Sequence, residues 1–267
     1  MSFLKKYITE PLRYTFSDGV KLFTGILLLV FNDIVSLLLF LMFIKMGFSV
    51  LILILLVNLF VHIVVLGYYI AVIKNTLEGL DTLPDWSNLG ELVKDGILYF
   101  FALFILVALM SFPAILISMI GSFLTTGVDI SYPTLEGDIE YLMYNYYFFN
   151  LLSGFLLLTI VLIYDVLAAT ILWVYVPLAT VNFAKKGFFG FFEVVDIFKK
   201  ISLGYIVMLV IYFTVYFTVA LILWIIGVVP VIGTAISTVY SRIFYFVFFT
   251  TFFRAVAKYY MEKEGWL

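Results

Sequence analysis

The sequence predicts an all-α integral membrane protein with six transmembrane helices. Its 267 residues are 65% hydrophobic and only 12% charged, whereas soluble folds average about 45–50% apolar and about 25% charged residues. The apolar residues gather in six runs, each near or above the roughly 20 residues that a helix needs to cross the hydrocarbon core. We expect these helices to form three helical-hairpin repeats, each preceded by an amphipathic helix on the cytoplasmic face.

The predicted spans cover residues 20–44, 47–73, 96–121, 150–183, 201–226 and 231–257. Glycine-containing turns separate the first two spans, at Lys45-Met46-Gly47, and the last two, between Gly227 and Gly233. A longer loop, 122–150, is acidic and rich in Tyr and separates the middle pair. Residues 1–267 then form a single membrane domain, without room for a second sizeable globular unit.

Lys and Arg are distributed unevenly between the two ends of these spans. If the N-terminus is cytoplasmic, nearly all of them lie inside, and only Lys45 lies at the outer rim. The 122–150 loop carries four acidic residues and no basic one. Because basic residues concentrate on the cytoplasmic side, we expect a multi-pass protein of the cell membrane with both termini in the cytoplasm. The N-terminal segment lacks a small-residue cleavage site, so we expect it to be retained.

Three polar stretches lead directly into spans and alternate apolar and charged residues at helical spacing. They cover residues 3–16, 85–97 and 188–200. A helix of this kind beside a span lies in the plane of the membrane interface. Asn88 and Glu91 are spaced for a capping pair, and Asp196 and Lys200 for an ion pair one helical turn apart. The alternative is that each stretch simply extends the following span into water.

The three stretches suggest an internal threefold repeat. The copies would be residues 1–74, 75–186 and 187–267. Asp18-Gly19 precedes the first span as Asp95-Gly96 precedes the third, and the even-numbered spans all end on Ala followed by a short run to Lys. In this interpretation the 122–150 loop is an insertion in the second copy, and each copy is an interfacial helix, a span, a turn and a second span.

Several short motifs are arranged as in a known family. They are Gly67-Tyr68, Leu77-Glu78-Gly79, Asp81, Leu83-Pro84, Trp86, Asp95-Gly96, Pro177, Asn182 and the turn at 227–233. In these residues the chain resembles a prokaryotic, largely archaeal, family of multispanning membrane proteins, the domain-of-unknown-function family four-zero-one-three. The resemblance covers nearly the whole chain, and its most specific part is 77–86. It implies a membrane protein and no particular activity, so no functional residues can be carried over.

Known catalytic and metal-binding patterns are missing from the sequence. There is no cysteine, and His62 is the single histidine, whereas a zinc site needs several converging ligands and an activated nucleophile needs a nearby base. The patterns GxSxG, HExxH and GxxxxGK[ST] do not occur, and no basic run is dense enough for nucleic acid. We therefore expect a protein that is not an enzyme and that has no cofactor, metal or nucleic-acid partner.

Six polar residues lie well inside the apolar runs. They are Asn32, Asp33, Asn58, His62, Asp165 and Arg242. Asp33 and Arg242 each lie twelve residues from a basic residue at the inner edge of the span, which places both about 18 Å deep at a rise of about 1.5 Å per residue. A charge at mid-membrane costs roughly 2.5–3.5 kcal/mol, so such residues usually pair. We expect Asp33 to neutralise Arg242, with Asp165 as the second candidate partner and His62 as a neutral neighbour.

This polar layer has two interpretations. It is either an ion pair and amide network that fixes how the helices pack, or part of an ion or proton path. The first is favoured because one basic and two acidic residues cannot line a continuous path alone.

A second candidate site is the polar stretch 74–96 between two spans. Here Glu78, Asp81, Pro84 and Trp86 make a candidate cytoplasmic interaction motif, with Trp86 as an interface anchor. The alternative is an ordinary solvated loop. The favoured function is a non-enzymatic scaffold or accessory subunit that contacts the lipid bilayer and protein partners at the cytoplasmic face. A channel or secondary transporter is the alternative, and a lipid enzyme ranks third, since it would need convergent polar residues near the headgroups.

Overall fold

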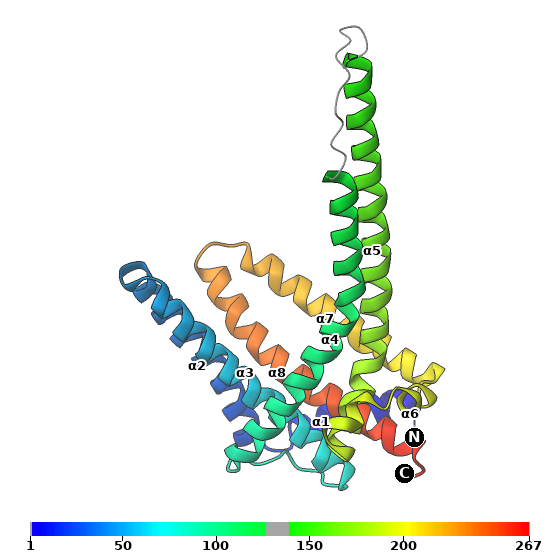
Figure 1. Ribbon diagram of the computed structural model, residues 1–267. Helices are drawn as coiled ribbons and strands as arrows, with labels where there is room; N and C mark the ends of the chain where they lie inside the picture. Colours follow the sequence, from blue (N-terminus) through cyan, green and yellow to red (C-terminus); the bar gives the residue numbers. More distant parts are fainter. Residues whose placement is uncertain (1, 127–138, 267) are drawn as a thin grey trace. The chain divides into compact units, whose positions relative to one another are not determined.

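The computed structural model describes residues 2–126 and 139–266, and all regular structure in these residues is helical (Figure 1). The helices are η1 (Lys5–Thr9), α1 (Glu10–Thr15), α2 (Gly19–Met46), α3 (Phe48–Leu77), α4 (Leu89–Thr126), α5 (Ile139–Lys186), η2 (Phe188–Phe192), α6 (Val194–Lys199), α7 (Leu203–Gly227) and α8 (Ile232–Lys263). Six of them, α2 to α5 with α7 and α8, are long and apolar enough to cross a membrane. The prediction of a multi-pass, all-helical membrane protein is confirmed.

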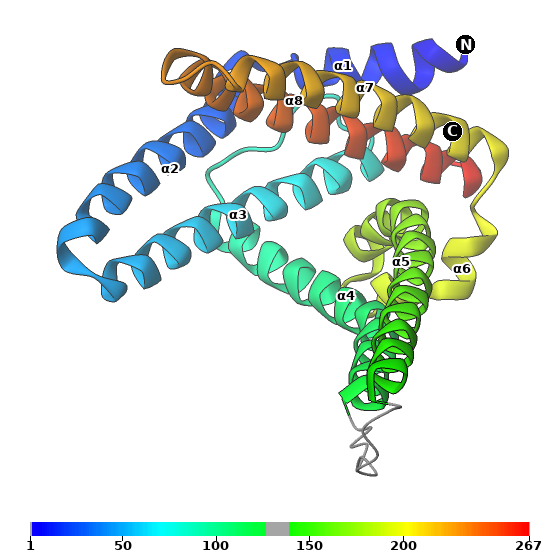
Figure 2. The same cartoon turned by 90° about the horizontal axis from the view of Figure 1, so that it is seen from above.

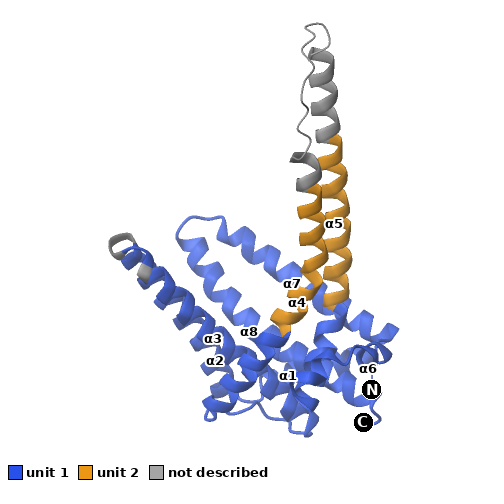
Figure 3. Cartoon of the chain, in the orientation of Figure 1, with its two compact units in different colours: residues 1–102, 174–267 blue, residues 103–173 orange. Residues whose placement is uncertain are grey.

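The chain divides into two compact units (Figure 3). The first comprises Met1–Ala102 and Val174–Leu267, and the second comprises Leu103–Trp173. In the second unit α4 and α5 are tied by a hydrogen bond that the Tyr164 hydroxyl donates to the Met110 carbonyl at 2.6 Å. All contacts described below lie within the first unit unless the second is named.

The two short turns lie where the sequence predicts them. α2 ends at Met46 and α3 begins at Phe48, and the intervening Gly47 has a φ of 76°. This left-handed backbone is strained for a residue with a side chain, which explains a glycine between two apolar helices. At the other turn α7 ends at Gly227 and α8 begins at Ile232.

The predicted long loop 122–150 is shorter than expected. α4 continues to Thr126 and α5 already begins at Ile139. Residues 139–150 contain neither Gly nor Pro, so nothing in this Tyr-rich run stops a helix, and its tyrosines belong to α5. The three acidic residues Asp129, Glu136 and Asp138 lie outside the described residues.

Two of the predicted amphipathic helices differ from expectation. The stretch 85–97 does not form a helix of its own, because α4 runs without a break from Leu89. The Asn88 carbonyl accepts the first amide hydrogen bonds of α4, and the Asn88 side chain donates to the Glu91 side chain at 2.8 Å, so the two residues pair through their side chains. The stretch 188–200 is interrupted at Glu193 between η2 and α6.

The packed core lies at one end of the first unit, which we call the base (residues 5–15, 67–102, 174–202 and 246–264). Tyr68 and Ile73 of α3 and Phe246 and Tyr260 of α8 are completely buried there. Figure 2 shows η1 and α1 lying along α8 and the 78–88 loop entering between α2, α3 and α8. The base is therefore built from segments that are distant in sequence.

The parts of the same helices that lie away from the base, which we call the far halves, are sparsely packed. They are residues 30–46 of α2, 48–60 of α3, 213–227 of α7 and 232–242 of α8. Apolar side chains such as Leu37, Leu55 and Ile225 stay more than half exposed within the chain. Lipid or another membrane protein must cover these surfaces, because hydrocarbon side chains this exposed are unfavourable in water.

At the base α3 and α4 cross with their backbones in direct contact. A Cβ atom added to Gly67 would lie 1.8 Å from the Leu92 carbonyl oxygen, and one added to Gly96 would lie 2.0 Å from that of Ile63. A side chain at either position would push the two backbones apart, so this crossing requires glycine at both. Small residues are common where helices cross closely in membranes. This contact explains the glycine of the Gly67-Tyr68 and Asp95-Gly96 motifs.

Candidate functional site

Asp33 of α2 and Arg242 of α8 meet in the polar layer of the far halves. The guanidinium donates from Nε to Oδ2 at 2.6 Å and from Nη2 to Oδ1 at 2.7 Å. This is the bidentate geometry in which both charges are best neutralised. The two side chains retain 31% and 20% of their exposure. The structure thus brings together Asp33 and Arg242, the two residues that their equal depth in the membrane predicts to pair.

The amide residues of the same layer form a separate chain of hydrogen bonds between α2 and α3. Asn32 donates to the Asn58 side chain at 2.8 Å, and Asn58 donates to the Ser36 hydroxyl at 2.8 Å. His62 Nδ1 lies 2.7 Å from the backbone carbonyl oxygen of Asn58. His62 therefore belongs to this amide chain, while Asp33 faces Arg242.

Asp165 is the second candidate partner for Arg242. It lies in α5 within the second unit, where its side chain is exposed and makes no ion pair with a described residue. Arg242 has both of its bidentate contacts on Asp33. Within the first unit, Arg242 is therefore already neutralised by Asp33.

Two grooves reach the Asp33–Arg242 pair. One, of about 610 Å³, lies between α2 and α8 and is lined by Val30, Asp33, Ile34, Leu37, Val231, Thr234, Ala235, Thr238 and Val239. The other, of about 460 Å³, lies between α7 and α8 and is lined by Tyr216, Ala220, Leu223, Trp224, Ser237, Ser241, Arg242, Phe244 and Tyr245. Each groove has mostly apolar walls and includes one member of the ion pair.

A second arginine of α8, Arg254, is the most deeply buried charge of the base. Its side chain is only 2% exposed. Nη1 donates to Thr76 Oγ1 at 3.1 Å and to the Leu80 carbonyl at 2.8 Å. Nη2 donates to Glu10 at 3.4 Å and to Asp81. This one guanidinium connects α1, the end of α3, the 78–88 loop and α8.

Aromatic stacking and a further ion pair complete the surroundings of Arg254. Its guanidinium lies over the Tyr14 ring at 4.2 Å from the centroid, and Glu10 is also bound by Lys258 at 2.5 Å. Burial raises the pKa of the Tyr14 hydroxyl well above its usual value, although the charge of Arg254 lowers it. From the sequence alone, Arg254 serves only as the basic residue that marks the inner edge of the last span. The signal in the sequence is its position directly between Thr250–Phe253 and Ala255–Ala257.

Two of the four residues of the candidate interaction motif 78–86, Pro84 and Trp86, are turned inward. Asp81 binds Arg254, and Pro84 is buried. The Trp86 ring stacks on Tyr68 with centroids 4.0 Å apart, and its indole N–H donates to the Lys21 carbonyl at 2.9 Å. Glu78 is the one residue of the four that is exposed and has no described partner. The motif therefore positions the 78–88 loop on the spans, and Trp86 serves as a packing residue of the base.

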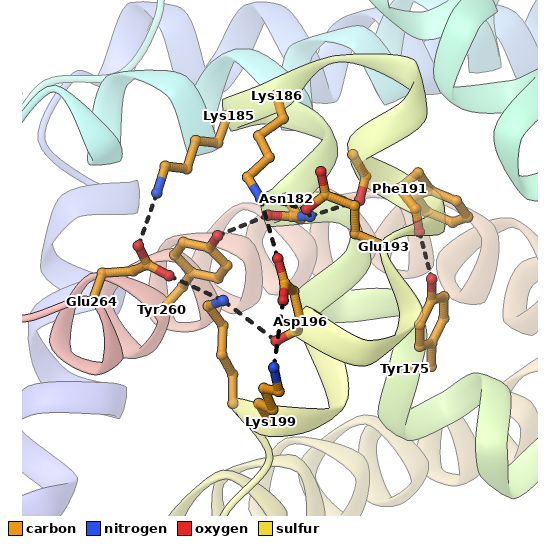
Figure 4. A network of polar contacts seen from close by, with 12 residues as sticks. Tyr175, Asn182, Lys185, Lys186, Phe191, Glu193, Asp196, Lys199, Tyr260 and Glu264 are labelled. Atoms are coloured by element: carbon orange, nitrogen blue, oxygen red, sulfur yellow. Dashed lines mark hydrogen bonds and ion pairs between the residues drawn. The ribbon is translucent and has the colours of Figure 1, made fainter.

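Asn182 of α5 organises the other side of the base (Figure 4). Its completely buried amide donates to the Gly190 carbonyl at 2.6 Å and to Glu193 at 3.0 Å, and its oxygen accepts from the Tyr260 hydroxyl at 2.7 Å. These bonds hold η2 against α5 and explain why the helix predicted over 188–200 breaks at Glu193. They also connect α5 to α8.

Lysines and glutamates surround Asn182 (Figure 4). Lys186 binds Glu193, while Lys185 and Lys200 each contact Glu264 at 3.0 Å. The hydrogen bond from Lys186 holds the pKa of Glu193 below its usual value, and Lys200, followed by Lys185, does the same for Glu264.

The expected ion pair between Asp196 and Lys200 is not formed. Lys200 reaches only the backbone carbonyl of Asp196, at 3.4 Å, and directs its charge to Glu264 on α8. The Asp196 carboxylate instead lies 3.6 Å from Lys186 and 4.0 Å from Lys199.

Comparison with known proteins places the chain in a family. Residues 48–228 match the family described as "Protein of unknown function (DUF4013)". The chain belongs to this family. The match runs from the start of α3 to the end of α7, and it therefore contains the 77–86 motif, the Gly67–Gly96 crossing and Asn182, but neither Arg242 nor Arg254.

Two curated relatives come from the archaeon Methanocaldococcus jannaschii. The uncharacterised protein MJ1189 is 36% identical over 156 residues, which are 58% of this chain and 47% of the relative. The uncharacterised protein MJ0233 is 28% identical over 155 residues, which are 58% of this chain and 48% of the relative. The chain thus spans about half the length of the curated relatives it matches. No solved structure matches it.

Proposed function

We propose that this DUF4013 protein is a non-enzymatic scaffold or accessory subunit of the cell membrane, with both termini in the cytoplasm. The observation that carries the proposal is the contrast between the tightly bonded base and the sparsely packed far halves. The base holds its polar groups in internal pairs, as around Arg254 and Asn182. The far halves offer long apolar helix surfaces at membrane depth.

The orientation of the protein in the membrane is inferred from the positions of lysines in the base and at the far end of α2. The base contains the lysines at the ends of α3 and α5 together with those of α8, while Lys45 lies at the opposite end of α2. Because cytoplasmic segments are enriched in Lys and Arg, the base is the cytoplasmic side. The repeat of residues 1–74, 75–186 and 187–267, with an interfacial segment before each pair of spans, is part of this proposal.

A rigid base with exposed far halves suits the binding of other transmembrane helices. Association of helices in membranes depends on side-chain packing, because lipid tails are as apolar as the helices themselves. Leu55 on α3, which is 62% exposed, and Trp224 on α7, which is 68% exposed, lie on such surfaces. Partner helices would cover these surfaces, while the base keeps the α2–α3 pair and the α7–α8 pair at a constant separation.

In-cell photo-crosslinking tests the proposal. A benzophenone amino acid at Leu55 or Trp224, in cells of the native host, should give one reproducible adduct with another membrane protein, identified by mass spectrometry. The same group at Phe189, which is 82% exposed on the base, is the matched control and should not give that adduct. Adducts with lipid or with the chain itself alone, at both positions, would contradict a scaffold role.

A channel or secondary transporter is the second candidate function. The two grooves favour it, because they approach Asp33 and Arg242 from different sides of α8. Charged residues at mid-membrane that adjoin a cavity are typical of ion and proton pathways. The bidentate pairing of the two charges speaks against it, since a mobile ion would have to displace one partner.

Flux measurements separate the two candidates. Purified protein in liposomes that contain a pH-sensitive dye should show no more proton leak than empty liposomes if the protein is a scaffold. A transporter would show a flux that is lost in Asp33→Asn and in Arg242→Met. The Glu78→Gln variant, at an exposed residue outside both groups, is the control.

A further inference from the structure

The N-terminal helical segment, η1 with α1, has two very different faces. Tyr7 and Tyr14 are buried on one face, where the Tyr212 hydroxyl donates to the Tyr7 carbonyl at 2.8 Å and Thr15 bonds to Thr251. The opposite face is open. Leu4, Leu12 and Phe16 on that face are 58%, 42% and 58% exposed.

Two cations lie beside these exposed apolar residues. Lys5 and Arg13 each follow a member of the apolar row, and both are exposed. Leu4, Leu12 and Phe16 are separated by multiples of four residues, so they lie on one side of the helix. Lys5 and Arg13 form a parallel row one position along the chain. The open face thus combines an apolar strip with two positive charges.

These cations differ from most other basic residues in and beside the base, which have acidic partners. Lys6, Lys21, Lys74, Lys185, Lys186, Lys199, Lys200, Arg254 and Lys258 each lie within 4.0 Å of a carboxylate. Among the described side chains, Lys5 and Arg13 make no such contact. Lys94 and Lys263 are the other exposed cations without one, and Lys263 lies over the Tyr259 ring. The open face of the N-terminal segment therefore carries positive charge that the protein itself does not neutralise.

The apolar strip continues into a membrane-spanning surface. Phe16 lies three residues before Gly19, where the span of α2 begins. Val20 and Phe23, in the first turns of that span, are 77% and 62% exposed. Since α2 enters the membrane at this point, the strip lies at the level of the lipid headgroups and the adjoining acyl chains.

We propose that this face binds anionic phospholipid headgroups in the leaflet next to the base. Leu4, Leu12 and Phe16 rest in the boundary between headgroups and acyl chains, and Lys5 and Arg13 bind the phosphates. Helices with this combination lie in the membrane interface and respond to anionic lipid. Each basic residue near an anionic surface strengthens binding about fivefold, so the two together give a preference of roughly 25-fold.

The absence of cysteine from the sequence makes a direct test possible. A single cysteine in Leu12→Cys can be labelled with bimane, and the protein placed in nanodiscs of phosphatidylcholine with phosphatidylglycerol. Bromine on the acyl chains of either lipid quenches bimane on contact. We expect brominated phosphatidylglycerol to quench at least several-fold more effectively than brominated phosphatidylcholine at equal mole fraction.

Variants identify the source of the preference. In the background of Leu12→Cys, the change Lys5→Gln with Arg13→Gln should make the two brominated lipids equally effective. Lys94→Gln, which removes an uncompensated cation elsewhere on the base, is the matched control and should leave the preference intact. Equal quenching by the two brominated lipids in the protein that carries Leu12→Cys alone would overturn the proposal. So would bimane that is quenched by aqueous iodide and not by lipid, or by neither.

Discussion

Two arginines of one helix are held in opposite ways. Arg242 and Arg254 are twelve residues apart on α8, about 18 Å along the helix axis at a rise of about 1.5 Å per residue. Among the described residues, Arg242 forms an ion pair with Asp33 alone, and it opens onto a groove. Arg254 is buried and has hydrogen-bond partners on three other segments.

The difference shows what each charge contributes. Asp33 and Arg242 neutralise each other, so removing both leaves no unpaired charge between α2 and α8. Arg254 satisfies a carbonyl, a hydroxyl and two carboxylates that come from separate parts of the chain, so no single compensating substitution replaces it. We infer that Arg242 is one half of a local pair, whereas Arg254 holds the base together.

Replacement of Arg254 by Met should have the largest effect on stability. It leaves the Leu80 carbonyl without its donor and leaves Glu10 with only Lys258 among its present cationic partners. Breaking a buried ion pair by removing one partner typically costs about 3–5 kcal/mol. The free energy of unfolding in mixed micelles should fall by about this amount. Asp81→Asn, which alters a mostly exposed partner of Arg254, should have a clearly smaller effect. Similar losses in the two variants would contradict the role of Arg254 as a hub.

Replacement of Arg242 by Met should have the next largest effect, because Asp33 would remain as a lone charge within the membrane. The free energy of unfolding in mixed micelles should fall by about 2.5 kcal/mol. The double variant Asp33→Asn with Arg242→Met should recover most of it. If the double variant is no more stable than Arg242→Met alone, the pair does not work as the structure indicates.

Two asparagines extend the comparison to uncharged groups. Asn182→Ala removes three hydrogen bonds of a completely buried amide in the base and should cost about 1–3 kcal/mol. Asn58→Leu, in the far halves, should cost only about 0.6 kcal/mol, the average for hydrogen bonds between membrane helices. Thermal unfolding in one detergent compares the two variants. A larger loss for Asn58→Leu would mean that the far halves contribute more to stability than their sparse packing suggests.

The smallest predicted effect concerns pH. Because Lys200 and Lys185 lower the pKa of Glu264 in the folded protein, its stabilising contribution is present above the ordinary glutamate pKa of about 4.3. It is lost as the pH falls through the lowered value. The pair is partly exposed, so the contribution should stay below about 1 kcal/mol. The melting temperatures of the wild type and Glu264→Gln should differ slightly at pH 7 and converge toward pH 3. A difference that persists at pH 3 would point to another cause.

Much of the membrane architecture can be predicted from the sequence because it depends on local composition. Runs of apolar residues indicate the six spans, and glycine marks the turn at Gly47. Counting residues from the inner edge places Asp33 and Arg242 at the same depth, since helical rise is constant.

The base is harder to predict because its contacts join segments far apart in the chain. Counting residues places Arg254 at the membrane edge, where it looks solvated, and nothing local reveals that α1 and the 78–88 loop cover it. Trp86 is similarly a residue type that often anchors a helix at the membrane interface, but here its ring stacks on Tyr68. Lys200 pairs with Glu264 because the fold brings the end of α8 next to α6, whereas the sequence suggests its helical neighbour Asp196.

The most direct test of the account is amide hydrogen exchange of the protein in nanodiscs, followed in residues 5–15 and 78–88. These segments lie outside the spans, so their protection depends on the base. We predict that Arg254→Met increases exchange in both segments together, while Arg242→Met leaves both as slow as in the wild type. Unchanged exchange in Arg254→Met, or an equal increase in Arg242→Met, would contradict the claim that Arg254 holds the base together.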